Sequence, residues 1–102
     1  MSTKNKSYFE KLEKAYGPLS FGSLLKAFRE AEDLTQVEFS EKLGLSKQNL
    51  SDLENGRRIP SPKRAAKIAK KLMLPEAPMI ELAIRDSLQK EGFNYEVRLK
   101  TA

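Results

Sequence analysis

The sequence predicts an all-α fold, and three observations support this. Apolar residues recur at spacings of three and four along most of the chain, as on one face of a helix. Residues that favour helix starts precede these runs, among them Thr35, Ser46 and Ser61, and Gly44 and Gly56 follow two of them. A period-two pattern, which is typical of a strand, occurs at the C-terminus alone.

Two helices are expected before residue 34. Ser7 and Glu10 form a capping-box pattern ahead of a short helix, which "GPLS" then interrupts. Its apolar residues are Tyr8, Phe9, Leu12 and Tyr16. Ser20 is a plausible cap for the second helix, which should end near Asp33. Its apolar residues are Phe21, Leu24, Leu25 and Phe28.

The next two predicted helices are short and lie on either side of a glycine. Thr35 and Glu38 form a capping box that opens a helix ending at about Leu43. Gly44 follows as the residue best able to adopt a left-handed turn. Ser46 then caps a helix that should run to about residue 55.

Two further helices complete the helical part of the prediction. Ser61 caps the first, with Pro62 at its favoured first position, and the inner stripe should be Ala65, Ile68, Ala69 and Leu72. Pro75 and Pro78 then punctuate the chain. The last helix should end at Gly92, with Ile80, Ala83, Ile84 and Leu88 facing inward.

The segment "FNYEVRLK", from Phe93 to Lys100, follows a different pattern. It alternates apolar and polar residues, which predicts a strand with Phe93, Tyr95, Val97 and Leu99 on one face. No second convincing strand exists in the chain, and one strand cannot satisfy its own backbone hydrogen bonds. The segment is therefore either a frayed tail with chance alternation, or a strand that pairs with a second subunit or a partner protein.

Composition limits the kind of protein this can be. A chain of 102 residues fits one small domain, and dimerisation would add buried surface. The absence of cysteine and histidine excludes disulfides, thiolate metal sites and imidazole catalysis, and leaves only acidic metal sites or carboxylate chemistry open. No cofactor is expected. No apolar run approaches the roughly 18 residues of a membrane span. The start "MSTKNKSYFEKLEK" lacks an apolar secretory core, and a soluble cytoplasmic protein is expected.

The positive charge of the chain is unevenly distributed. The net charge is +5, and the segment from Asn55 to Pro75 contains seven Lys or Arg and no acid. Such local asymmetry suits a polyanion such as DNA. The alternative is an ordinary solvated basic helix face.

The helix from Ser46 to Asn55 has an outward face rich in amides and charges. With Leu50 and Leu53 inward, Gln48 and Asp52 point almost directly away, and Lys47, Asn49, Ser51 and Asn55 lie beside them. Glutamine and asparagine can pair with adenine, lysine can donate to guanine, and aspartate can accept from cytosine. This pattern favours reading of a major groove, although a polar outer face is also what any solvated helix shows.

The spacing around this helix resembles a known family. Phe39 and Leu43 precede the turn, and Leu45, Leu50 and Leu53 follow it. Together with "LTQ", "LGLS" and "LENGRRIPSP", the stretch from Gln36 to Asn55 is similar to the helix-turn-helix of the phage-repressor, XRE-type family. Many relatives have alanine where this chain has serine at position 40, and serine is still small enough for the turn.

The resemblance covers about Phe21 to Leu74 and implies a five-helix, lambda-repressor-like all-α domain. We expect an extra N-terminal helix within residues 1–20, a DNA-binding domain at 21–91, and a C-terminal β-strand or tail at 92–102. The strand is expected to serve dimerisation or partner binding through Phe93, Tyr95, Val97 and Leu99.

The same resemblance implies roles for individual residues. Residues expected to read bases are Lys47, Gln48, Asn49, Ser51 and Asp52. Residues expected to contact phosphate are Gln36, Ser46, Asn55, Arg57 and Arg58. Arg29 and Glu54 border the inward faces of their helices, and family members use a similar pair to tie these helices together. We therefore expect this pair to be structural rather than catalytic.

These observations predict a sequence-specific DNA-binding transcriptional repressor. It should act as a homodimer on an inverted repeat whose half-sites lie about 34 Å apart. The alternative is an antitoxin that neutralises a toxin protein and represses its own operon. An enzyme is disfavoured, because no catalytic constellation is evident. The expected location is the cytoplasm of a prokaryotic or phage-infected cell, at the nucleoid and without membrane contact.

Overall fold

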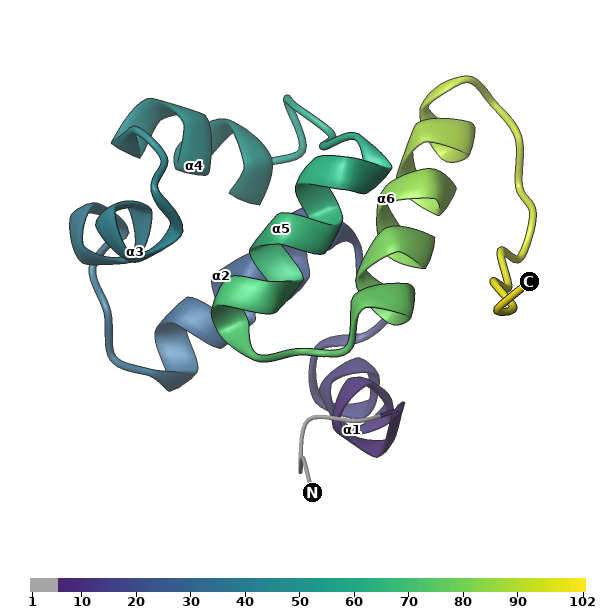
Figure 1. Ribbon diagram of the computed structural model, residues 1–102, viewed down its shortest axis with the longest axis horizontal. Coiled ribbons are helices and arrows are strands. Elements are labelled where there is room, and N and C mark those ends of the chain that lie inside the picture. Colours follow the sequence, from purple (N-terminus) through teal and green to yellow (C-terminus); the bar gives the residue numbers. More distant parts are fainter. Residues whose placement is uncertain (1–5) are drawn as a thin grey trace.

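The computed structural model describes residues 6–102 of the chain, and this part contains six helices and no β-strand (Figure 1). The helices are α1 (Lys6–Tyr16), α2 (Phe21–Ala31), α3 (Gln36–Leu43), α4 (Lys47–Glu54), α5 (Pro62–Leu72) and α6 (Glu76–Lys90). None of them is long and apolar enough to cross a membrane.

Side-chain caps fix the starts of the four central helices. The hydroxyl of Ser20 accepts from the backbone N–H of Ser23, and Thr35 and Glu38 form the expected capping box. Ser46 and Ser61 cap α4 and α5 in the same way. These four caps are confirmed. Ser7 does not stand at the expected N-cap position, because α1 already begins at Lys6. The side chain of Ser7 lies outside the described residues.

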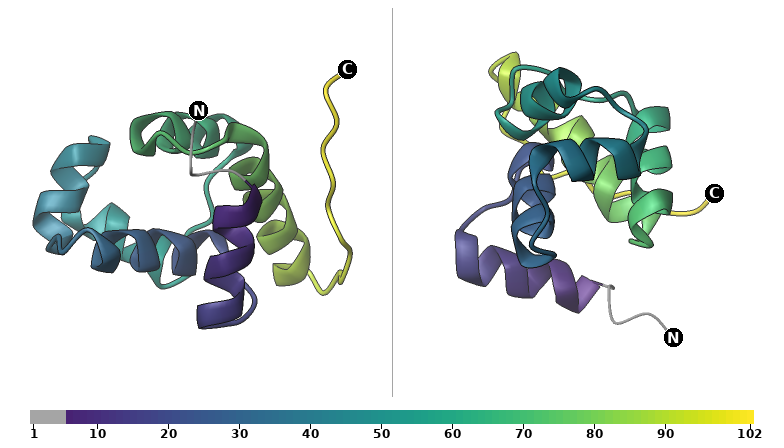
Figure 2. Two further views of the ribbon diagram at one scale, coloured as in Figure 1. Left: turned by 90° about the horizontal axis from the view of Figure 1, so that it is seen from below. Right: turned by 90° about the vertical axis from the view of Figure 1, so that its left-hand side faces the viewer.

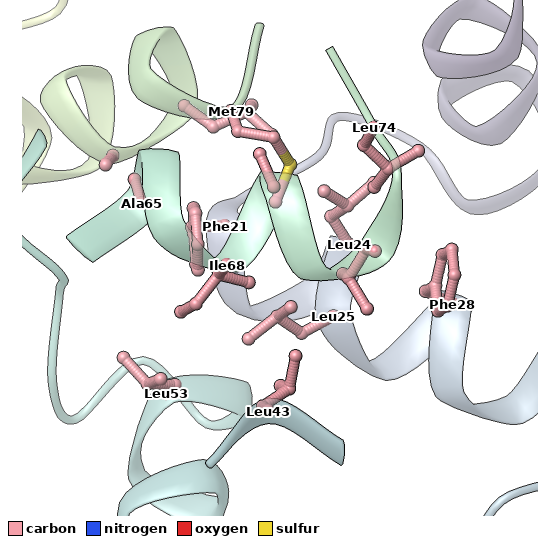
Figure 3. Close-up of a cluster of buried hydrophobic side chains, with 14 of the residues drawn as sticks. Phe21, Leu24, Leu25, Phe28, Leu43, Leu53, Ala65, Ile68, Leu74 and Met79 are labelled. Atoms are coloured by element: carbon pink, nitrogen blue, oxygen red, sulfur yellow. The ribbon is translucent and has the colours of Figure 1, made fainter. Parts of the chain in front are cut away.

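One apolar core joins all six helices. Figure 3 shows its centre, where side chains from α2 meet others from α4, α5 and α6. Phe39, Leu50 and Leu72 are fully buried, as the helical spacing predicts. Phe9 of α1 belongs to the same cluster, so α1 packs on the body of the protein. The proposed domain boundaries at residues 20 and 91 stay a prediction.

The inward stripe predicted for α6 is partly wrong. Ala83 is buried, but Ile80, Ile84 and Leu88 are only half-buried, and the buried side chains are Met79, Leu82 and Ala83. The stripe continues to Asp86, whose carboxylate accepts a hydrogen bond from the backbone N–H of Phe21 at 2.8 Å. A carboxylate at position 86 breaks the apolar pattern of this face. The apolar spacing therefore predicted a buried face that is centred about one residue further along α6.

The predicted C-terminal strand is also wrong. Residues 93–102 form no strand and instead run back along α6 as an extended segment (Figure 2). The N–H of Phe93 donates to Leu88 at the end of α6, and the N–H of Leu99 donates to Glu81 Oε2 at 2.8 Å. Since no other strand lies in the described part of the chain, no β-ladder can form. Of the four predicted side chains, Val97 alone is half-buried and the others are exposed.

Candidate nucleic-acid interface

Helices α3 and α4 are joined by a tight turn whose geometry depends on glycine. Gly44 has φ of +71°, a left-handed conformation that residues with a Cβ rarely adopt. The N–H of Leu45 donates to Ser40 at 2.8 Å, which closes the turn. Ser40 itself is buried, and its hydroxyl donates to the carbonyl of Val37 at 2.8 Å. The turn therefore tolerates a serine where a small residue is required.

Lys71 of α5 fastens this turn from a distance in sequence. Its Nζ donates to the carbonyl oxygen of Leu43 at 2.9 Å. Leu43 is the last residue of α3, where carbonyl groups lack partners within the helix and a cation is favourable. Lys71 thus links the end of α3 to α5.

A buried ion pair sets α4 against α2. Arg29 donates to Glu54 through two hydrogen bonds, Nε to Oε2 at 2.8 Å and Nη2 to Oε1 at 3.1 Å. Only 2% of the Glu54 side chain is exposed. Arg29 Nη1 also donates to the carbonyl of Leu34, so one guanidinium connects α2, the following loop and α4. Hydrogen bonding with Glu54 raises the pKa of Arg29 above its ordinary value.

Gln36, expected to contact phosphate, lies at this ion pair. Its Nε2 donates to Glu54 Oε1 at 3.1 Å, so the first residue of α3 is tied to the last residue of α4. An amide nitrogen has two hydrogens, and the second leaves Gln36 able to donate outward. The residue is half-buried, and its contact with phosphate stays a prediction.

The outward face of α4 carries the expected polar side chains. Lys47 and Gln48 are exposed, and Asn49, Ser51 and Asp52 are half-buried. Leu50 and Leu53 point into the core. Ser46 is exposed at the N-cap, where its hydroxyl accepts from the backbone N–H of Asn49 at 3.0 Å.

Several of these side chains contact one another. Asp52 Oδ1 accepts from Gln48 Nε2 and from Arg57 Nε, each at 2.9 Å. Hydrogen bonding with Arg57 keeps the pKa of Asp52 below its ordinary value, so the carboxylate stays ionised. Asn55 Nδ2 donates to the carbonyl of Ser51 at 2.9 Å. Hydrogen bonds thus link Asp52 to Gln48 and Arg57, and Ser51 to Asn55 and Arg57. Arg57 and Arg58, which follow α4, are both exposed.

A basic groove of about 360 Å³ lies at the α3–α4 turn. The sequence indicated the positive charge of this part of the chain, but none of the groove's lysines was predicted as a site residue. The groove separates the α3–α4 turn from α5, and its cationic lining residues are Lys63, Arg64, Lys67 and Lys71. No carboxylate lines it. The spacing of Lys63, Lys67 and Lys71 in steps of four was the signal available, because such residues share one helix face.

This fold and surface define a helix-turn-helix DNA-binding protein: two short helices at a glycine turn, with the polar face of the second exposed. Within the described residues, no group of acidic side chains could hold a metal ion.

The comparisons with known proteins agree. The family described as Helix-turn-helix matches residues 25–77, just over half of the chain. The chain belongs to this family of DNA-binding transcriptional regulators.

Three relatives are similar to part of this chain. The "ImmF control region 10 kDa protein" of Bacillus phage phi105 is 46% identical over 48 residues, which are 47% of this chain and 53% of that protein. The HTH-type transcriptional repressor RghR of Bacillus subtilis is 32% identical over 79% of this chain and 62% of its own length. An uncharacterized HTH-type transcriptional regulator of Methanocaldococcus jannaschii is 46% identical over 45% of this chain and 70% of its own length.

The chain therefore spans between half and two thirds of the length of the first two relatives. No solved structure matches the chain significantly.

Proposed function

We propose that the protein is a sequence-specific repressor of transcription that binds double-stranded DNA in the cytoplasm. The observation that carries this proposal is the outward face of α4, where Lys47, Gln48 and Asn49 are presented in the first turn of a helix fixed from behind. Such side chains can reach base edges in a major groove, since each base pair presents a distinct pattern of donors and acceptors there. The similarity to RghR, which is named a transcriptional repressor, also favours a repressor.

The expected backbone contacts surround this helix. Ser46, Asn55, Arg57 and Arg58 lie at its two ends, and Gln36 retains one free N–H. We propose that the basic groove beside α5 adds further phosphate contacts through Lys63, Arg64 and Lys67. Lysine and arginine contacts with phosphate supply affinity that is independent of sequence and falls with salt.

A homodimer on an inverted repeat fits the short reading helix. An eight-residue α4 reaches only a few base pairs, whereas a genome offers about a million or more competing sites. Two copies related by a two-fold axis double the number of bases read. The C-terminal segment, which forms no strand, is not part of the proposed dimer contact.

Selection of bound fragments from random duplex DNA tests the function. The purified chain should enrich an inverted repeat with half-sites about one helical turn apart. Gln48→Ala should relax preference at one position of each half-site. Enrichment of no sequence by the wild-type chain would contradict the proposal.

The antitoxin alternative is supported by a different surface. The rings of Phe93 and Tyr95 stack with centroids 6.4 Å apart, yet 48% and 65% of these residues are exposed. Exposed aromatic residues are common at protein–protein contacts. A neighbouring reading frame that encodes a small basic nuclease-like protein, and co-purification of that product with the chain, would favour the antitoxin.

A further inference from the structure

Asp52 contacts both Gln48, which is proposed to read a base, and Arg57, which is proposed to bind phosphate. Its Oδ1 accepts from Gln48 Nε2 and from Arg57 Nε at 2.9 Å each. Arg57 Nη2 also donates to Ser51 Oγ at 3.3 Å, and the backbone N–H of Arg57 donates to the carbonyl of Asp52 at 2.9 Å. The loop after α4 is therefore held against α4 chiefly through Asp52.

The contact with Asp52 determines which way the Gln48 amide faces. A carboxylate accepts hydrogen bonds and repels another oxygen, so the amide must turn its nitrogen toward Asp52. The Gln48 oxygen and one N–H then remain free. A bidentate contact with adenine requires one acceptor and one donor of this kind.

The negative charge of Asp52 has a separate effect on the affinity for DNA. A carboxylate on a DNA-facing surface is repelled by phosphates, and this repulsion penalises every sequence alike. Arg57 offsets the charge by pairing with Asp52 at 2.9 Å. Direct acceptance from cytosine is the other role open to Asp52, through Oδ2, because both donors bind Oδ1.

We propose that Asp52 is a positioning residue, which orients the Gln48 amide for base reading and keeps Arg57 beside it at the DNA backbone. This rests on the proposed DNA-binding function. Asp52 then contributes to sequence discrimination through Gln48 rather than through a base of its own.

The test is a binding profile over all single-base variants of the selected operator. It compares the wild type with Asp52→Ala and Asp52→Asn, each also made in a Gln48→Ala background. Asparagine keeps an oxygen that Gln48 can donate to, whereas alanine removes it. Glu13→Gln on α1 is the charge control, because it removes one exposed acid from a helix that does not touch α4 (Figure 1).

Asp52→Ala should reduce discrimination about tenfold at the base pair assigned to Gln48, and only there. Asp52→Asn should keep that discrimination while binding all sequences more tightly, and Glu13→Gln should change neither property. In the Gln48→Ala background, Asp52→Ala should cause no further loss at that base pair, because residues that act through one another are not additive.

Two outcomes would overturn the proposal. One is a loss of discrimination by Asp52→Ala that persists without Gln48, which would make Asp52 a direct base reader. The other is an unchanged profile for Asp52→Ala. A wild-type chain that prefers no sequence would instead overturn the proposed function and, with it, this inference.

Discussion

Arg29 of α2 and Glu54 of α4 form a bidentate ion pair at 2.8 and 3.1 Å, with the carboxylate almost completely enclosed. Gln36 donates to the same carboxylate from α3. Because Glu54 is the last residue of α4, this cluster fixes one end of α4 relative to two other helices. The outward face of α4 is thus positioned by a polar contact as well as by the core.

Removal of Arg29 should leave the buried Glu54 carboxylate without a cationic partner. Arg29→Ala is expected to lower the free energy of unfolding by about 3 kcal/mol, since breaking a buried pair leaves an uncompensated charge. Arg98→Ala is the control, because the Arg98–Glu96 pair is longer, at 3.6 Å, and exposed. It should cost less than about 0.5 kcal/mol. Urea denaturation measures both, and similar midpoints for the two variants would refute a buried role for Arg29.

Gly22 allows α2 to approach the end of α4 closely. A Cβ there would collide with the backbone carbonyl oxygen of Leu53 and lie 2.8 Å from that of Glu54. Because backbone atoms cannot rotate away, Gly22→Ala should destabilise the fold by about 2 kcal/mol or more. Lys26→Ala, on the exposed face of the same helix, should be nearly neutral. A Gly22→Ala protein that melts with the wild type would mean that α2 and α4 separate easily.

Lys71 should protect the turn of the helix-turn-helix. Lys71→Met removes the donor to Leu43 and should cost about 1 kcal/mol, the usual worth of such a bond. It should also speed hydrogen exchange at the backbone amides of Gly44 and Leu45. Lys70→Met removes the same charge from an exposed neighbour and should leave these amides protected. Equal exchange in both variants would remove Lys71 from this role.

Asp86 should give the stability a distinct pH dependence. Burial raises the pKa of its carboxyl above the ordinary value, opposed by the hydrogen bond from Phe21 and the charge of Arg85. The folded chain therefore binds this proton more readily than the unfolded chain. The contribution of Asp86 to stability rises as the pH falls through its raised pKa and is complete below the ordinary value.

Comparison with Asp86→Asn isolates this effect. The free energy of unfolding of the wild type, minus that of the variant, should increase from about pH 7 to about pH 3. Asp52→Asn should show the opposite trend, because the lowered pKa of Asp52 supplies stability that is lost on acidification. A difference for Asp86→Asn that is flat, or that falls on acidification, would contradict the assignment.

The basic groove should contribute to the salt dependence of DNA binding. Replacing Lys63, Arg64 and Lys67 by glutamine should reduce the slope of log K against log salt by about 2 to 3. Base preference should not change, because phosphate contacts carry no sequence information directly. The matched control replaces Lys11, Lys14 and Lys26, which are exposed on α1 and α2. Equal slopes for the two triple variants would exclude a specific role for the groove.

The sequence predicted what depends on neighbouring residues. Thr35, Ser46 and Gly44 fix the limits of α3 and α4 through contacts within a few positions, so their pattern is sufficient. The contact of Lys71 with Leu43 spans 28 positions, and no local pattern shows it.

The wrong predictions for the inward stripe of α6 and for the C-terminal strand have a related cause. Asp86 occupies an inward position of α6 because it caps the distant start of α2, which spacing alone does not show. The alternation from Phe93 to Leu99 satisfies the local rule for a strand, but a strand also requires a partner. In the described part of the chain, the backbone N–H of Phe93 donates instead to the carbonyl of Leu88, and that of Leu99 donates to the carboxylate of Glu81.

The proposed reading of DNA sequence by the outward face of α4 can be measured directly. The direct measurement is the ratio of affinities for the selected operator and a scrambled duplex, at one fixed salt concentration. We predict a ratio of about 1,000 or more for the wild type. Replacing Lys47, Gln48 and Asn49 by alanine should bring it close to one while the helical fold is retained. A wild-type ratio near one, or a high ratio that survives these replacements, would contradict the claim.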